Sequence, residues 1–274
     1  MDNNKLKYAE VSGYKLAYQT AGEGEPLLLV HGITTYSFIW RRIIPKLKTN
    51  YKITAVDLLG CGASDKPLDI EYSIINHARL LKEFVEQTDL GKVHFIGHDI
   101  GGGIGQRFAV EYPEFLTKLT LINSVGYDYW PVQPIVIMRT PIIRQFAMAA
   151  LDLGSFRMIV KRGLYHKENL TLELMDLFWK PMKTKEGRKA FLHFAASLNN
   201  KHLLEIENEL KNLQIPVLIL RGSHDPYLSR DIAARLHNDI PGSRLEIIRN
   251  SGHFMQEDEP EKIVQALTKF IQES

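Results

Sequence analysis

Hydrophobic and polar positions along this 274-residue chain show two periodicities, one typical of strands and one typical of amphipathic helices. Two short alternating segments lie within residues 7–21, around Tyr8 and Tyr18, and predict an opening antiparallel hairpin. The fully apolar run 27–30 follows a proline and predicts a strand buried on both faces.

Beyond residue 30, strand-like and helix-like segments alternate. This order predicts an α/β fold with a mostly parallel central sheet and helices on both faces. The predicted strands are 52–57, 92–97, 118–122, 216–220 and 244–248, and the predicted helices are 36–48, 73–88, 101–112, 229–238 and 259–272.

The alternation stops between residues 125 and 212. This stretch has helix-like periodicity and several aromatic residues, and its prolines at 131, 134, 141 and 181 predict several short helices. We therefore expect a core domain formed by residues 1–124 and 213–274, with a helical cap of residues 125–212 inserted after the sixth strand. Because ligands of open α/β sheets bind beyond the carboxyl ends of the strands, the cap should roof the site.

Composition excludes several classes of partner. The chain has 34 Lys and Arg against 32 Asp and Glu, and no basic face that would predict a nucleic-acid partner. The single Cys61 rules out an internal disulfide and offers no metal cluster, so we expect neither metal nor cofactor. The first residues are polar, and no apolar run reaches the length of about 18 residues that a membrane span needs, so we expect a cytoplasmic protein without a membrane span. We expect either a monomer or a homo-oligomer.

Asp99 is the most informative residue for chemistry. Residues 93–103 read as an apolar strand, a glycine-flanked turn and a helix start, the context of the nucleophile elbow G-x-S-x-G, with Asp99 in place of serine. The flanking Gly97 and Gly101 remove side chains that would clash in this strained turn. With an ordinary pKa of about 3.9, the carboxylate is ionised at neutral pH and needs no base to attack.

Three further segments, together with the elbow itself, provide the groups that such a site needs. The backbone N–H groups of Ile33, after the His-Gly pair at 31–32, and of Ile100 predict an oxyanion hole. Asp225 follows one predicted strand and is a candidate to orient a histidine, and His253 follows the next strand. Each of these sequence signals is weak alone. The His-Gly loop, the elbow, Asp225 and His253 occur in this order, each at the end of a predicted strand, and together they favour a catalytic site.

These motifs resemble the α/β-hydrolase superfamily over nearly the whole chain, including its order of nucleophile, acid and histidine. The segments HGITTYSFIWR (31–41) and DLLGCGASDKP (57–67) are similar to haloalkane dehalogenases, whereas FIGHD (95–99) is closer to epoxide hydrolases. The resemblance therefore implies the branch that uses an aspartate nucleophile. Asn123 stands where this fold can alternatively keep its acid, and it is no carboxylate, which favours Asp225.

The chain also departs from these families. Haloalkane dehalogenases usually place Trp after the nucleophile and often Asn after the His-Gly pair, both as halide donors, whereas this chain has Ile100 and Ile33. Fluoroacetate dehalogenases usually have Arg after the nucleophile, which is absent here. Epoxide hydrolases need only the backbone N–H at that position, although they usually show Pro where Thr34 stands.

An aspartate nucleophile suits attack on an sp³ carbon, which gives an alkyl ester, better than attack on an ester carbonyl, which would give an anhydride. His253, held by Asp225, would then activate the water that hydrolyses the ester on Asp99. A halide leaves with N–H donors alone, whereas a ring-opened epoxide needs a proton, which a tyrosine can supply. Candidate donors in the cap are Tyr127, Tyr129, Tyr165, Trp130 and Trp179.

The missing halide donors favour hydrolysis of an epoxide to a diol, with a small apolar organic substrate. Haloalkane dehalogenation, releasing halide and an alcohol, is the alternative. A third hypothesis, from a different functional class, is a ligand-binding receptor with little catalytic turnover. The intact set of Asp99, Asp225 and His253 argues against it, because a pure binder needs no general base.

Overall fold

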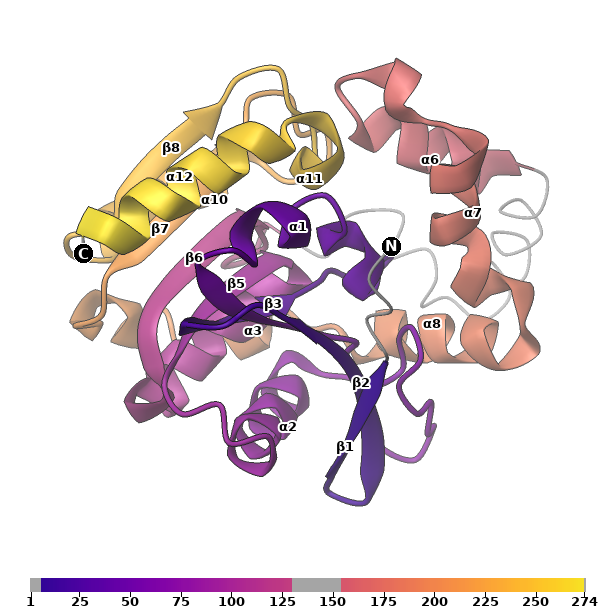
Figure 1. The fold of residues 1–274 in the computed structure, drawn as a ribbon, viewed down its shortest axis with the longest axis horizontal. Helices are drawn as coiled ribbons and strands as arrows, with labels where there is room; N and C mark the ends of the chain where they lie inside the picture. The colour runs from indigo at the N-terminus through magenta and orange to yellow at the C-terminus, as the bar shows by residue number, and fades with distance from the viewer. Residues whose placement is uncertain (1–5, 130–153, 274) are drawn as a thin grey trace.

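The computed structural model describes residues 6–129 and 154–273, which build one eight-stranded sheet in the order β1-β2-β4-β3-β5-β6-β7-β8 (Figure 1). The strands are β1 (Lys7–Val11), β2 (Tyr14–Ala21), β3 (Glu25–Val30), β4 (Tyr51–Val56), β5 (Val93–Asp99), β6 (Leu116–Ser124), β7 (Val217–Gly222) and β8 (Arg244–Ile248).

The helices between them are α1 (Ile44–Leu47), α2 (Ile74–Gln87), α3 (Ile100–Glu111), α6 (Phe156–Gly163), α7 (Leu172–Trp179), α8 (Lys185–Ser197), α9 (Lys201–Leu204), α10 (Arg230–Asp239), α11 (Met255–Asp258) and α12 (Pro260–Glu273). Short 3₁₀ turns are η1 (Ser37–Trp40), η2 (Pro113–Phe115), η4 (Lys167–Asn169), η5 (Lys180–Lys183) and η6 (Glu209–Asn212).

The sheet is mostly parallel, as predicted. β1 and β2 form the expected antiparallel hairpin, β2 pairs antiparallel with β4, and β3 to β8 pair in parallel. β3 is central, because residues 27–30 pair with β4 on one side and with β5 on the other. Their side chains are buried, which explains the unbroken apolar run.

Helices cover both faces of the sheet. On β5, the His94 ring packs against Phe270 of α12 at 5.7 Å, and the next residue, Phe95, packs against Phe108 of α3 at 5.5 Å between ring centroids. Because successive side chains of a strand point to opposite faces, α12 and α3 lie on opposite sides of the sheet. This arrangement confirms the predicted α/β architecture (Figure 1).

The prediction of one helix over residues 36–48 is wrong. The structure has the 3₁₀ turn η1 and the one-turn helix α1, with Pro45 near the start of α1. Proline fits the first turn of a helix but breaks its interior, so the two pieces stay separate. The Ser37 backbone N–H also donates to Asp57 Oδ1 at 2.8 Å, which ties η1 to the end of β4.

Between β6 and β7, the described residues 125–129 and 154–212 contain helices and turns but no strand. Thr171 and Thr184 start α7 and α8 as N-caps, since each side chain accepts a backbone N–H three residues later. Figure 1 shows α6, α7 and α8 gathered to one side of the sheet. The division into core and cap stays a prediction, and Trp130 lies outside the described residues.

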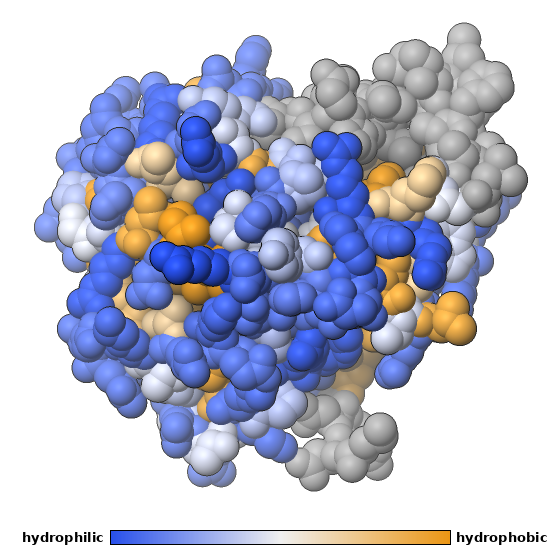
Figure 2. Space-filling view, turned by 90° about the horizontal axis from the view of Figure 1, so that it is seen from above, coloured by the Kyte–Doolittle hydropathy of each residue, from blue (hydrophilic) through white to orange (hydrophobic). Residues whose placement is uncertain are grey.

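The face seen in Figure 2 is largely hydrophilic, with separate small hydrophobic patches. Scattered exposed hydrophobic side chains of this kind are ordinary on protein surfaces. Within the two described ranges, no helix combines the length and apolar character needed to cross a bilayer. The same residues hold no group of three His, Cys, Asp or Glu side chains arranged for a metal ion.

Candidate active site

Asp99 lies at a sharp turn between β5 and α3, with φ 55° and ψ −118°, a conformation that L-residues rarely adopt. The neighbouring glycines permit this turn. A Cβ on Gly97 would lie 2.3 Å from the Gly101 carbonyl oxygen, and a Cβ on Gly101 would lie 2.4 Å from that of Val30. Strand, turn and helix can therefore meet only because residues 97 and 101 lack side chains.

The two predicted amide donors converge on the Asp99 carboxylate. The backbone N–H of Ile33 donates to Asp99 Oδ2 at 3.1 Å, and the backbone N–H of Ile100 also lowers the pKa of the carboxylate. Burial raises the pKa of Asp99, while the charge of His253 and the two N–H donors oppose the rise. The ordinary pKa expected from the sequence is therefore wrong, because the pKa of Asp99 is raised.

The oxyanion loop, residues 31–35, is held in place by His31. The Leu58 backbone N–H donates to His31 Nε2 at 3.0 Å, so in the neutral ring Nδ1 carries the proton and donates to the Gly32 carbonyl at 2.7 Å. Burial lowers the pKa of His31, in accord with a neutral ring. A Cβ at Gly32 would lie 2.5 Å from Asp99 Oδ2, so this glycine lets the loop approach the carboxylate.

Asp225 and His253 form a buried pair. His253 Nδ1 lies 3.0 Å from Asp225 Oδ2, and Asp225 Oδ1 accepts the backbone N–H groups of Tyr227 and Leu228. Burial raises the pKa of Asp225, but His253, Arg221 and backbone N–H donors outweigh it and hold the pKa at about 2. The carboxylate is thus ionised, and His253 Nδ1 must donate the hydrogen bond.

The pKa of His253 is raised. Burial lowers it, but the charge and hydrogen bond of Asp225 and the charge of Asp99 act in the opposite direction and prevail. Asp99, Asp225 and His253, predicted from three separate strand ends, therefore form one interacting group. Since Nδ1 is bound to Asp225, Nε2 is the ring nitrogen left to exchange a proton.

The loop that carries His253, residues 249–254, is tied to helix α6. The backbone N–H groups of His253 and Phe254 both donate to the carbonyl oxygen of Gly163, at 2.7 and 3.2 Å. Asp258 Oδ2 accepts the backbone N–H of Gly252 at 2.8 Å and that of Tyr165 at 2.9 Å. The stretch between β6 and β7 therefore contacts the histidine loop directly.

His98 and Asn123 also support this loop, and neither role was predicted from the sequence. His98 Nε2 donates to the His253 carbonyl at 3.0 Å, and burial lowers the pKa of His98 to about 3, so its ring is neutral. Asn123 Nδ2 donates to the carbonyls of Gly252 and His253 at 2.9 and 3.0 Å. Position 123 is recognisable in the sequence as an alternative place for the acid, but no sequence signal indicates that either side chain supports the histidine loop.

A small cavity lies beside the oxyanion loop, under η5 and α8. The side chains that line it are mostly apolar or small, and Cys61 among them is a neutral thiol, because burial raises its pKa to about 12. The lining includes Ile33, Thr35, Cys61, Met182, Phe191 and Phe194. Such walls suit an apolar group, and the cavity borders Ile33 of the oxyanion loop but not Asp99 itself.

The predicted leaving-group donors have different surroundings. The Tyr127 hydroxyl donates to Asp239 Oδ2 at 2.8 Å, at the end of α10, so we leave Tyr127 out of the proposed site. Tyr165 is 37% exposed and its ring packs against His224, 4.7 Å between centroids. Trp179 packs against Phe156 at 5.4 Å, and Tyr129 is 43% exposed, while Trp130 lies outside the described residues.

The chain belongs to the α/β-hydrolase fold family, whose pattern matches residues 25–260. Haloalkane dehalogenase 2 of Mycobacterium tuberculosis is 27% identical over 270 residues, which cover 95% of this chain and 93% of that protein. The cis-3-alkyl-4-alkyloxetan-2-one decarboxylase of Shewanella oneidensis is 23% identical over 290 residues, 98% of this chain and 89% of that protein.

Among solved structures, the epoxide hydrolase CorEH superposes with a TM-score of 0.86 at 24% identity, covering 98% of this chain and 99% of that chain. At this identity the likeness shows the fold alone. Together the comparisons confirm the predicted superfamily and the prediction that the protein is an enzyme. It is an α/β-fold hydrolase with a haloalkane dehalogenase among its relatives, and its fold matches that of an epoxide hydrolase.

Proposed function

We propose that the protein hydrolyses a small apolar organic substrate through a covalent ester on Asp99, and that an epoxide, converted to a diol, is its substrate. One observation carries the proposal. The carboxylate of Asp99 lies against the Ile33 N–H and acts electrostatically on His253, which in turn is held by Asp225. Nucleophile, oxyanion donor and general base thus belong to one site.

In the first step, an oxygen of Asp99 attacks an sp³ carbon of the epoxide. A bond forms between that oxygen and the carbon, the ring C–O bond breaks, and the released alkoxide takes a proton from a donor in the enzyme. Tyr129 and Tyr165 stay candidates for this donor, because neither hydroxyl has a described partner that would exclude it.

In the second step, His253 Nε2 takes a proton from a water that attacks the ester carbonyl of Asp99. The backbone N–H groups of Ile33 and Ile100 stabilise the tetrahedral oxyanion, and loss of one such donor typically costs about 3–4 kcal/mol. Collapse breaks the bond between the ester carbonyl carbon and the alkyl oxygen, and His253 returns its proton to that oxygen, which releases the diol. The proton left on Asp99 passes to the donor that was deprotonated in the first step, which restores the carboxylate. Asp225 keeps the histidine in the tautomer that the step needs.

Two observations divide the substrate classes. Ile33 and Ile100 offer a leaving halide no side-chain N–H, which favours the epoxide. Haloalkane dehalogenation is the second candidate, supported by the 27% identical dehalogenase that matches nearly the whole chain. Both reactions share the ester on Asp99 and differ only in how the leaving group is stabilised.

The test is to incubate the purified protein separately with styrene oxide and 1-bromobutane, with Asp99→Ala as the control. Diol formation that disappears in the variant supports the proposal, whereas bromide release alone selects the second candidate. Ligand-induced thermal stabilisation with neither product would indicate a receptor and overturn the proposal. Turnover of p-nitrophenyl acetate that survives Asp99→Asn, or decarboxylation of a cis-dialkyl-oxetan-2-one, would also contradict it.

A further inference from the structure

Arg221, at the end of β7, has a buried guanidinium whose charge is directed at Asp225. The Arg221 side chain is 8% exposed, and its Nη1 lies 2.9 Å from Asp225 Oδ2. The same carboxylate oxygen accepts the hydrogen bond from His253 Nδ1. One oxygen atom is thus shared between a permanent cation and the histidine proposed as the base.

Asn123 fixes the guanidinium in this position. Its Oδ1 accepts from Arg221 Nη1 at 3.0 Å and from the Gly222 backbone N–H at 2.9 Å. Its Nδ2 donates to the carbonyls of Gly252 and His253, so the amide links β6, β7 and the histidine loop in one orientation. A carboxylate at position 123 would face those two carbonyl oxygens without a proton to donate.

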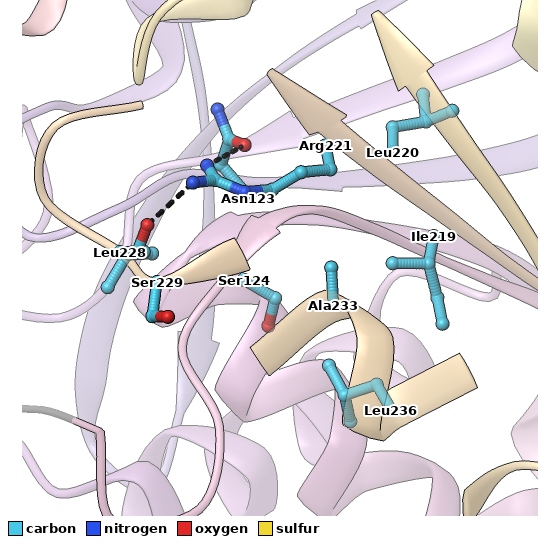
Figure 3. A pocket seen from close by; sticks show the side chains of 9 residues that line it. All are labelled: Asn123, Ser124, Ile219, Leu220, Arg221, Leu228, Ser229, Ala233 and Leu236. Carbon is cyan, nitrogen blue, oxygen red and sulfur yellow. Dashed lines mark hydrogen bonds between the residues drawn. The ribbon is translucent and has the colours of Figure 1, made fainter. Parts of the chain in front are cut away.

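Figure 3 shows Arg221 between Asn123 and the carbonyl oxygen of Leu228, which accepts from Nη2 at 2.6 Å. Arg221 also borders a small enclosed cavity of about 10 Å³, next to Ser124 and Ser229. An open surface depression of about 450 Å³ also borders Arg221 and Asp225, but their side chains are only 8% and 0% exposed, so little solvent reaches the pair. A charge pair shielded from solvent interacts far more strongly than an exposed pair.

We propose that Arg221, oriented by Asn123, is a positioning residue that aims the Asp225 carboxylate at His253 and takes up part of its charge. The inference rests on the proposed function, since it assigns Arg221 an effect on the second step. It predicts that Arg221 limits how strongly His253 holds a proton, which keeps the base available near neutral pH.

The charges around His253 agree with this role. Asp225 and Asp99 raise the pKa of His253, and Arg221 lowers it. The titratable and charged groups that face the histidine or its loop are Asp99 and neutral His98 from β5, Arg221, Asp225 and Tyr227 from the end of β7 onward, and Asp258 from α11. Arg221 is the permanent cation of this group.

The test compares Arg221→Met and Arg221→Gln, which remove the charge, with Arg221→Lys, which keeps it. The kcat–pH profile of the two neutral variants should shift its acid limb upward by on the order of one unit, with KM little changed. Arg221→Lys should keep the limb near that of the wild type. Arg230→Met, which removes an exposed arginine of the same segment, is the matched control and should show no shift.

A second readout separates this proposal from the proposed function. The His253 imidazole can be titrated by NMR without substrate, with its signal identified from its loss in His253→Gln. Its midpoint should rise in folded Arg221→Gln or Arg221→Met, whether or not a substrate is turned over. An unchanged midpoint and an unchanged acid limb in a folded neutral variant would overturn the role of Arg221. A uniform loss of kcat at every pH would indicate a merely structural contribution and would also overturn it.

Discussion

Replacing His253 by glutamine should separate the two steps of the proposed reaction. Alkylation needs the Asp99 carboxylate and a proton donor for the released alkoxide. The substitution replaces neither group, although it removes the charge of His253 that opposes the rise in the pKa of Asp99. Hydrolysis of the ester needs a base at His253 Nε2. The variant should therefore form the covalent ester and fail to release it.

General-base catalysis sets the size of the effect, and the contacts of Asp225 indicate that the variant folds. A general base contributes about 10²–10⁴-fold to a rate, equivalent to roughly 3–5 kcal/mol of barrier. The Asp225 charge stays compensated after the substitution, because Arg221 lies 2.9 Å from its Oδ2 and two backbone N–H groups bind its Oδ1. The buried carboxylate is thus not left unpaired, which would be costly.

Intact-protein mass spectrometry after a single addition of styrene oxide is the assay. His253→Gln should gain the mass of the epoxide, and peptide mapping should place the added mass on Asp99. His237→Gln, which replaces an exposed histidine of α10, is the matched control and should turn over normally without an adduct. An unmodified His253→Gln that also makes no diol, beside an active wild type, would refute the reasoning.

Two predictions concern stability. Gly101→Ala should lower the free energy of unfolding by about 3 kcal/mol or more, because its Cβ would lie 2.4 Å from the backbone oxygen of Val30. Gly105→Ala, whose Cβ would meet only side-chain atoms, should lower it far less. Equal urea midpoints for the two variants would count against the elbow geometry. Since the pKa of Asp225 is held at about 2, below its ordinary value, its stabilisation is present at neutral pH and disappears as the pH falls through about 2. The stability gap between wild type and Asp225→Asn should therefore narrow by about 2 kcal/mol between about pH 5 and pH 2, and a constant gap would contradict the assignment.

Much of the fold can be predicted because its signals are local. The apolar run 27–30 reflects a strand paired on both sides, and the glycines around Asp99 reflect a turn that admits no side chain. The helix predicted over 36–48 fails because periodicity alone does not register Pro45 or the hydrogen bond from Ser37 to Asp57. Local pattern gives the elements, but contacts between distant segments decide where short helices break.

Part of the candidate site can likewise be predicted from the sequence, and part of it cannot. Asp225 and His253 can be predicted because the carboxyl ends of neighbouring parallel strands meet at one edge of the sheet. The support that Asn123 and Arg221 give to Asp225 and the histidine loop cannot be predicted from the sequence. It depends on the orientation of an amide and on a side chain that reaches across a turn. The leaving-group donor cannot be predicted from the sequence either, because the direction in which an aromatic side chain points depends on tertiary packing, as Tyr127 shows.

The most direct test of the central claim is a single turnover in ¹⁸O-labelled water with enzyme in excess over substrate. If Asp99 forms an ester that water hydrolyses at the carbonyl carbon, the first product carries an unlabelled oxygen from the carboxylate and the label enters Asp99. The account predicts a labelled peptide containing Asp99 and an unlabelled new hydroxyl in the product. Label appearing directly in the product, with Asp99 unlabelled, would contradict it.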